Sequence, residues 1–128
     1  MLIPYGYPPQ ISLQQADFPP SLTPYLVQQE DVGSFWLVNT GHDILAFDRR
    51  TPFRVGSEPC RYSWVAANGR FKDPCSGSKF ALDGTLIEEP AVRDLIAYPV
   101  TINKNGTITI YVDLDVDESL FAPRNTAE

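Results

Sequence analysis

The sequence predicts an all-β fold, an antiparallel sandwich or small barrel of short strands. Three turn signals, Asn68-Gly69, Asp83-Gly84 and Asn105-Gly106, each separate two β-rich segments. After the last of these turns, apolar and polar residues alternate over residues 107–114, which is the pattern of a half-buried strand. Residues 90–96 are the only segment suited to a helical turn. The pattern therefore favours strands packed around one core.

The expected strands follow one another at short intervals. They cover residues 25–28, 34–39, 44–47, 62–66, 70–72, 79–82, 85–88, 98–103 and 107–114. The first 25 residues are rich in proline, which fixes φ and removes backbone donors, so we predict an extended arm there. We expect this arm to lie against its own domain or a neighbouring subunit. The predicted organisation is an arm at 1–25, a domain at 26–116 and a tail at 117–128.

Length and charge limit the possible functions. The chain has 128 residues, which suits one domain, and its net charge of −6 argues against nucleic acid and anionic membranes as partners. No apolar run reaches the roughly 18 residues that a membrane span needs. Residues 1–10 lack the basic and apolar regions of a signal peptide, so none is expected.

Few side chains are available to bind a soft metal. The chain has two cysteines, Cys60 and Cys75, and one histidine, His42. A tetrahedral site of four thiolates, or of two thiolates and two imidazoles, cannot be built from these residues. The cysteines are therefore either two free thiols or one disulfide.

One segment carries a family resemblance. Residues 70–80 read RFKDPCSGSKF, which resembles the second cluster-binding loop of Rieske-type iron–sulfur proteins, Cys-Pro-Cys-His-Gly-Ser followed by a basic residue and an aromatic. The runs LDGT at 82–85 and PAVR at 90–93 continue the match, and residues 34–38, 45–47 and 60–65 resemble the strands around the first loop. The resemblance covers residues 30–112. It implies a Rieske-like fold in which a two-loop subdomain, at about residues 50–96, is inserted.

The chain departs from the family at every cluster ligand. A Rieske centre needs two thiolates on one iron and two imidazoles on the other. The four ligand positions fall on Thr51, Phe53, Asp73 and Ser76. A second alignment of the first loop places Val55 and Ser57 there in place of Thr51 and Phe53. Neither alignment supplies a thiolate or an imidazole, so we expect no cluster and no other cofactor.

The resemblance also assigns a role to the two cysteines. In many Rieske proteins a disulfide ties the two loops together, and Cys60 and Cys75 stand at those positions. We therefore expect a disulfide between them. The alternative is a pair of reduced thiols in a cytosolic protein.

The remaining site residues have ordinary interpretations. Asp73, with Glu58 or nearby hydroxyls, can form a small metal site, but the favoured interpretation is a solvated acid at the loop tip. Phe53 either fills the volume of the missing ligand or is exposed at the loop tip as a docking residue. The other docking candidates lie in the arm and are Tyr5, Tyr7, Pro8 and Pro9.

These observations favour a non-enzymatic accessory subunit. It keeps the Rieske fold as a docking scaffold within a larger assembly, plausibly an electron-transfer membrane complex, and self-association is compatible with this role. One alternative is a redox protein that uses a Cys60–Cys75 dithiol, and another is a small-molecule or regulatory binding module. No convergent acid, base and nucleophile indicates an enzyme. A formed disulfide would indicate an extracytoplasmic or membrane-complex location.

Overall fold

The computed structural model describes residues 10–29, 33–55, 58–91 and 93–112, and strands dominate this part of the chain. The only helical element described is a 3₁₀ turn, η1 at Gln15–Asp17. The all-β prediction is confirmed. The strands are β1 Gln10–Gln14, β2 Tyr25–Gln29, β3 Gly33–Asn39, β4 Ile44–Phe47, β5 Arg50–Val55, β6 Glu58–Arg61, β7 Ser63–Val65, β8 Arg70–Lys72, β9 Lys79–Phe80, β10 Leu86–Glu88, β11 Ala97–Tyr98, β12 Val100–Ile102 and β13 Thr107–Tyr111.

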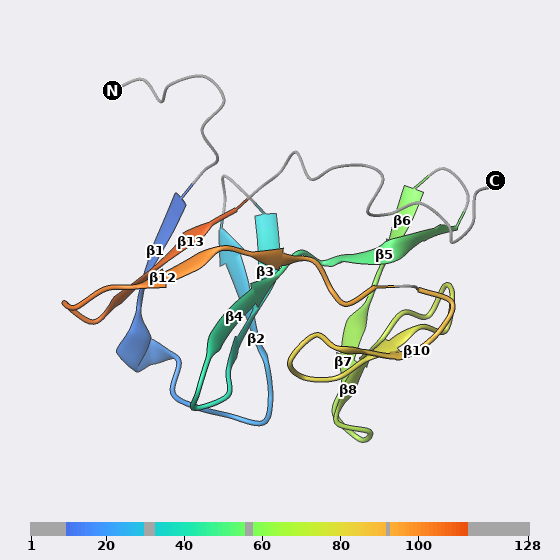
Figure 1. Ribbon diagram of the computed structural model, residues 1–128, viewed down its shortest axis with the longest axis horizontal. Helices are drawn as coiled ribbons and strands as arrows, with labels where there is room; N and C mark the ends of the chain where they lie inside the picture. Colours follow the sequence, from blue (N-terminus) through green and yellow to red (C-terminus); the bar gives the residue numbers. More distant parts are fainter. Residues whose placement is uncertain (1–9, 30–32, 56–57, 92, 113–128) are drawn as a thin grey trace.

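The strands form three sheets and one two-stranded ribbon. The sheets have the orders β1-β13-β12, β11-β4-β3-β2 and β10-β9-β8-β7, and the ribbon is β5-β6. Every pairing is antiparallel. In Figure 1 the first two sheets occupy the left and centre, and the third lies to the right, below the ribbon. The ribbon and the third sheet contain the two loops of the family resemblance.

Strand β3 connects two hydrophobic cores. Phe35 and Leu37 belong to the first core, together with buried residues of β13, whereas Trp36 and Val38 belong to the second core, beneath the third sheet. Successive side chains of a strand point to opposite faces, so this strand is buried on both sides. The near-continuous apolar run of β3 is the expected pattern for such a strand.

Part of the predicted arm is a strand of the domain. Strand β1 pairs with β13 at the edge of the first sheet, and Ile11 is buried in the first core. This segment contains no proline, so all of its backbone donors remain available. Residues 10–14 are thus extended, as predicted, and lie against their own domain. Tyr5, Tyr7, Pro8 and Pro9 lie outside the described residues.

Two other segments differ from their predictions. Strands β5 and β6 were not expected, and their pairing shifts register between Arg50 and Arg54, around Pro52. Residues 90–96, the segment suited to a helical turn, form no helix in the part of it that is described. The backbone N–H groups of Ala91 and Leu95 donate to Ser78 Oγ and to the Gly84 carbonyl, so they are not available for helical bonds.

The last predicted hairpin is divided between two sheets. The expected strand 98–103 is two short strands, because β11 pairs with β4 and β12 pairs with β13. Pro99 lies between them and has no backbone N–H to continue a ladder. The chain therefore passes from the second sheet to the first at this proline. Residues 113 and 114 of the predicted final strand lie outside the described residues.

Candidate functional site: two loops joined by a disulfide

A disulfide between Cys60 and Cys75 joins the two loops, as predicted. Cys60 lies on β6, and Cys75 lies in the turn between β8 and β9, with 6.2 Å between the two Cα atoms. Cys75 is exposed and Cys60 is half-buried. The bridge holds the ribbon against the third sheet, so residues that are distant in sequence form one surface feature.

Asp73 is fully buried, so the expected solvated acid is wrong. The backbone N–H of Cys75 donates to Asp73 Oδ1 at 3.0 Å, and the Ser76 hydroxyl donates to Oδ2 at 2.7 Å. The loop folds back over the carboxylate because Gly77 N donates to the Asp73 carbonyl and Asp73 N donates to the Ser78 carbonyl. Gly77 has φ +87°, a conformation that glycine adopts without strain.

Ser76 belongs to a short chain of hydroxyl groups within this loop. Its Oγ is 2.9 Å from Ser78 Oγ, which in turn accepts a hydrogen bond from the Ala91 backbone N–H at 2.9 Å. Ser78 and Ala91 are both fully buried. The position that carries a histidine ligand in the family thus connects the loop to the following segment.

Thr51 and Phe53 lie side by side on β5 and both face inward to some degree. Thr51 is fully buried, and its Oγ1 has no hydrogen-bond partner among the described residues. Phe53 is half-buried and packs against the second core, so it is not a fully exposed tip residue. Of the residues in the second alignment, the side chain of Val55 and all of Ser57 lie outside the described part.

The chain is similar in sequence to two curated iron-sulfur subunits. No protein-family profile matches the chain. It is 34% identical over 50 residues to the chloroplast cytochrome b6-f complex iron-sulfur subunit of Volvox carteri. This match covers 39% of this chain and 24% of that protein. The corresponding subunit of Chlamydomonas reinhardtii is 31% identical over 58 residues, covering 45% and 28%. The matches thus span about a quarter of these relatives' length.

Solved structures of similar fold also include a Rieske protein. The cyanobacterial plasma membrane Rieske protein of Synechocystis superposes with a TM-score of 0.50 at 27% identity, covering 70% of this chain and 86% of that one. The chain contains a Rieske-type domain. A chain of a hyperthermophilic respiratory Complex III shares the fold, with a TM-score of 0.53 at 16% identity, covering 76% and 71%. No helix in the described ranges is long and apolar enough to cross a membrane.

The side chains of this Rieske-type domain do not match a Rieske cluster. A Rieske cluster is held by two thiolates and two imidazoles, whereas these positions offer two hydroxyl groups, a phenyl ring and a carboxylate. His42, the chain's only histidine, is exposed in the turn between β3 and β4. Both cysteine sulfurs are bonded to each other. The donors at the four matched positions therefore differ from those of a Rieske cluster.

One group of possible ligands was not expected in this combination. The two cysteine sulfurs and a carboxylate oxygen of Asp73 all lie within 4.8 Å of one another. In the sequence analysis, Asp73 with Glu58 or the hydroxyls of Thr51 and Ser76 was the less favoured, metal-site interpretation. Cys75 is only two positions from Asp73, but it was assigned to the disulfide alone. The side chain of Glu58 lies outside the described residues.

A second buried carboxylate, Asp48, supports the first loop and was missed by sequence reasoning. Arg50 donates to both of its oxygens, at 2.9 and 2.6 Å, and the Tyr98 hydroxyl donates to Oδ2 at 2.8 Å. Burial raises the pKa of Asp48, but the hydrogen bonds from Arg50 and Tyr98 outweigh it and lower the pKa overall. The Tyr62 hydroxyl donates to the Asp48 carbonyl, and burial raises its pKa well above the usual value.

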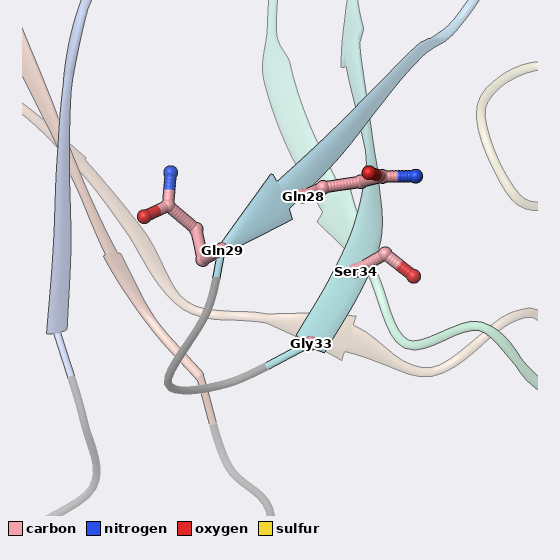
Figure 2. A pocket seen from close by; sticks show the side chains of 4 residues that line it. All are labelled: Gln28, Gln29, Gly33 and Ser34. Carbon is pink, nitrogen blue, oxygen red and sulfur yellow. The ribbon is translucent and has the colours of Figure 1, made fainter.

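Two surface pockets lie next to the β2–β3 hairpin. One, of about 430 Å³, is lined by Gln28, Gln29, Gly33 and Ser34. In Figure 2 the side chains of Gln28 and Ser34 point to one side of the hairpin, and that of Gln29 to the other. The second, of about 310 Å³, shares Gly33 and Ser34 and is lined further by Asp48, Arg49, Arg50, Arg61 and Tyr98. None of these described lining residues is a cysteine or a ligand position of the two loops.

Proposed function

We propose that this Rieske-type domain carries no iron–sulfur cluster and acts as a non-catalytic scaffold subunit within an electron-transfer membrane complex. The observation that carries the proposal is the state of the four ligand positions. Asp73 and Ser76 bond to each other within the second loop, Thr51 is buried, and Phe53 packs on the second core. These side chains serve the structure of the domain, whereas none is a donor that iron–sulfur chemistry requires.

The loop framework is nevertheless retained. The Cys60–Cys75 disulfide ties the loops together without a metal, and the Asp48 network supports the start of the first loop. A disulfide-tied loop pair without the thiolate and imidazole ligands of a cluster is suited to binding another protein rather than to carrying electrons through iron. The relatives are iron–sulfur subunits of cytochrome b6-f complexes, which supports a larger complex of that kind as the assembly.

Metal analysis tests the first half of the proposal. The full chain would be produced in cells that assemble iron–sulfur clusters, next to a cluster-binding Rieske protein as a positive control. We expect no stoichiometric iron or acid-labile sulfide in this chain, and no electron paramagnetic resonance signal of a reduced Rieske centre. Stoichiometric iron and sulfide would show that ligands come from elsewhere and would refute the proposal.

Native electrophoresis tests the second half. The tagged chain would be expressed in its own host, and membranes would be solubilised in a mild detergent. We expect the chain to migrate in a complex much larger than its own 14.3 kDa, together with haem absorbance.

Removing residues 1–9, which contain the docking candidates Tyr5, Tyr7, Pro8 and Pro9, should release the chain from this complex. Leu22→Ser is the matched control because Leu22 is 86% exposed. Migration of the wild-type chain as a monomer contradicts the scaffold role.

The exposure of Cys75 supports a second candidate, a dithiol–disulfide redox function. An exposed sulfur is open to attack by an incoming thiolate, as exchange reactions require. Equilibration in glutathione or dithiothreitol buffers would measure the reduction potential. A value below about −300 mV is typical of structural disulfides and would leave only the scaffold role, whereas a higher value would favour redox exchange.

A further inference from the structure

Within the described part of the chain, no cation balances the charge of Asp73. Its carboxylate is fully buried, and its hydrogen-bond donors are neutral, the Cys75 N–H and the Ser76 hydroxyl. No lysine or arginine pairs with it among the described residues. By contrast, buried Asp48 is paired with Arg50 at 2.6 Å. A buried charge is costly unless an opposite charge accompanies it, so Asp73 stands in a place that favours a cation.

The two possible metal ligands beside Asp73 are the cysteine sulfurs. The sulfurs of Cys60 and Cys75 and an Asp73 oxygen all lie within 4.8 Å of one another. Around a tetrahedral zinc ion, with Zn–S near 2.3 Å and Zn–O near 2.1 Å, ligand atoms are separated by roughly 3.5–3.8 Å. Once their bond breaks, the two sulfurs part by rotation about the cysteine χ1 angles, which moves them toward this spacing.

We propose that reduction of the Cys60–Cys75 disulfide opens a Zn²⁺ site formed by the two cysteine thiolates and the Asp73 carboxylate. A dithiol reductant supplies two electrons and two protons, the S–S bond breaks, and two thiols form while the reductant becomes a disulfide. Zinc binding then releases the two thiol protons, and water completes the coordination. Thiolates favour Zn²⁺ over Mg²⁺ or Ca²⁺. Cys75 is the exposed residue of the pair, so the reductant would approach the bridge from its side.

The disulfide and the zinc site thus exclude each other. In the oxidised domain both sulfurs are consumed by their mutual bond, so no thiolate is available to a metal. In the reduced domain zinc would replace the covalent tie between β6 and the loop after β8. The inference goes beyond the scaffold role and does not depend on any partner protein. Its test uses zinc alone, whereas the scaffold role is tested by iron, sulfide and complex size.

Zinc titration of the full chain tests the site. One sample would be reduced with dithiothreitol, which is then removed without air, and the other would stay oxidised. Each would be titrated with Zn²⁺ against a chromophoric chelator. We expect one zinc per reduced chain and none per oxidised chain. Co²⁺ in place of Zn²⁺ should give thiolate charge-transfer absorption and the visible bands of a tetrahedral ion in the reduced sample only. Equal binding by both samples would overturn the proposal.

Variants separate a built site from two loose thiols. Loss of an outer-sphere partner alone costs roughly 10–100-fold in metal affinity, so Asp73→Asn, which removes a ligand, should weaken zinc binding at least ~10-fold. Asp43→Asn, in an exposed turn, is the matched control and should bind like the wild type. Cys75→Ser should abolish binding.

Circular dichroism would show whether each reduced sample remains folded. An unfolded dithiol would bind zinc whether or not Asp73 is present. Unchanged affinity in Asp73→Asn therefore overturns the assignment, in folded and unfolded samples alike. Binding that survives in Cys75→Ser would also overturn it.

Discussion

Asp48 and Asp73 are buried carboxylates with opposite surroundings, and the local sequence reveals the burial of neither. Asp48 depends on Tyr62 and Tyr98, which are 14 and 50 positions away. Asp73 depends on a loop that closes through Gly77 and Ser78. The resemblance predicts which residues stand at the cluster-ligand positions, because that needs only a local match of the sequence. It did not predict their burial, because burial depends on long-range packing and on how the loop closes.

The Asp48 network should make stability depend on acid pH. The pKa of Asp48 is lowered in the folded state, so its contribution to stability is present above the unfolded value, about 3.9, and is lost as pH falls below it. Tyr98→Phe removes one hydrogen bond to the charged group. It should cost about 1.5–3 kcal/mol at pH 7 and reduce the loss of stability below pH 4. Urea unfolding between pH 3 and 7 measures both effects.

Tyr111→Phe is the control for this change, because Tyr111 is only half-buried on β13. Its unfolding free energy should follow the wild-type curve at every pH. If Tyr98→Phe and the wild type lost stability equally below pH 4, the network would not be the source of the acid dependence.

At the scale of elements, strands after residue 25 with clear alternation or turn signals were predicted, whereas β1 and the ribbon were not. Strand β4 was predicted with its observed bounds, and β3 within one residue, because their apolar patterns are dense. Strands β5 and β6 contain Pro52 and Pro59, and proline is unfavourable in a ladder because it has no backbone N–H. Their pairing tolerates these residues with an irregular register, beside a disulfide that local patterns do not contain.

The turn between β9 and β10 requires glycine for two separate reasons. Gly84 has φ +88°, and a Cβ at this position would lie 2.6 Å from the buried ring of Phe47. Gly106 also has a positive φ, +86°, but no atom lies within 4 Å of a Cβ built there. It therefore needs glycine for its backbone conformation alone, not for lack of space. Gly106→Ala should cost about 1–2 kcal/mol, and Gly84→Ala about 1–3 kcal/mol more. Urea unfolding of both variants measures the difference, and equal losses would mean that the Phe47 ring moves aside freely.

The disulfide closes a short loop, so its removal should have a predictable effect. Cys60 and Cys75 are 15 positions apart, and a loop of this size corresponds to about 3 kcal/mol in the chain-entropy model. The double variant Cys60→Ala with Cys75→Ala should therefore remain folded but lose about 3 kcal/mol. Urea unfolding of the oxidised wild type and the variant, both without metal, tests this. A loss below ~1 kcal/mol would show that the loops are held by their hydrogen bonds.

At the scale of the whole molecule, the two cores are joined through one strand. Leu37 faces the first core, and its neighbour Val38 faces the second. A substitution that shifts the backbone of β3 from one face therefore also shifts the residues of β3 that pack in the other core. The sequence predicted one domain from length alone, but the division into two cores follows from the three-dimensional arrangement of the sheets.

This shared strand should make the domain unfold as one unit. Trp36 and Trp64 lie in or against the second core, so tryptophan fluorescence reports that core, whereas far-ultraviolet circular dichroism reports all sheets. Leu37→Ala damages the first core and should cost about 2–5 kcal/mol, and Phe71→Ala damages the second and should cost about 3–5 kcal/mol. In each variant the two signals should change at the same urea concentration. If Leu37→Ala shifted the dichroism transition but left the fluorescence transition in place, the second core would be stable without the first, and the loop subdomain would be an independent folding unit.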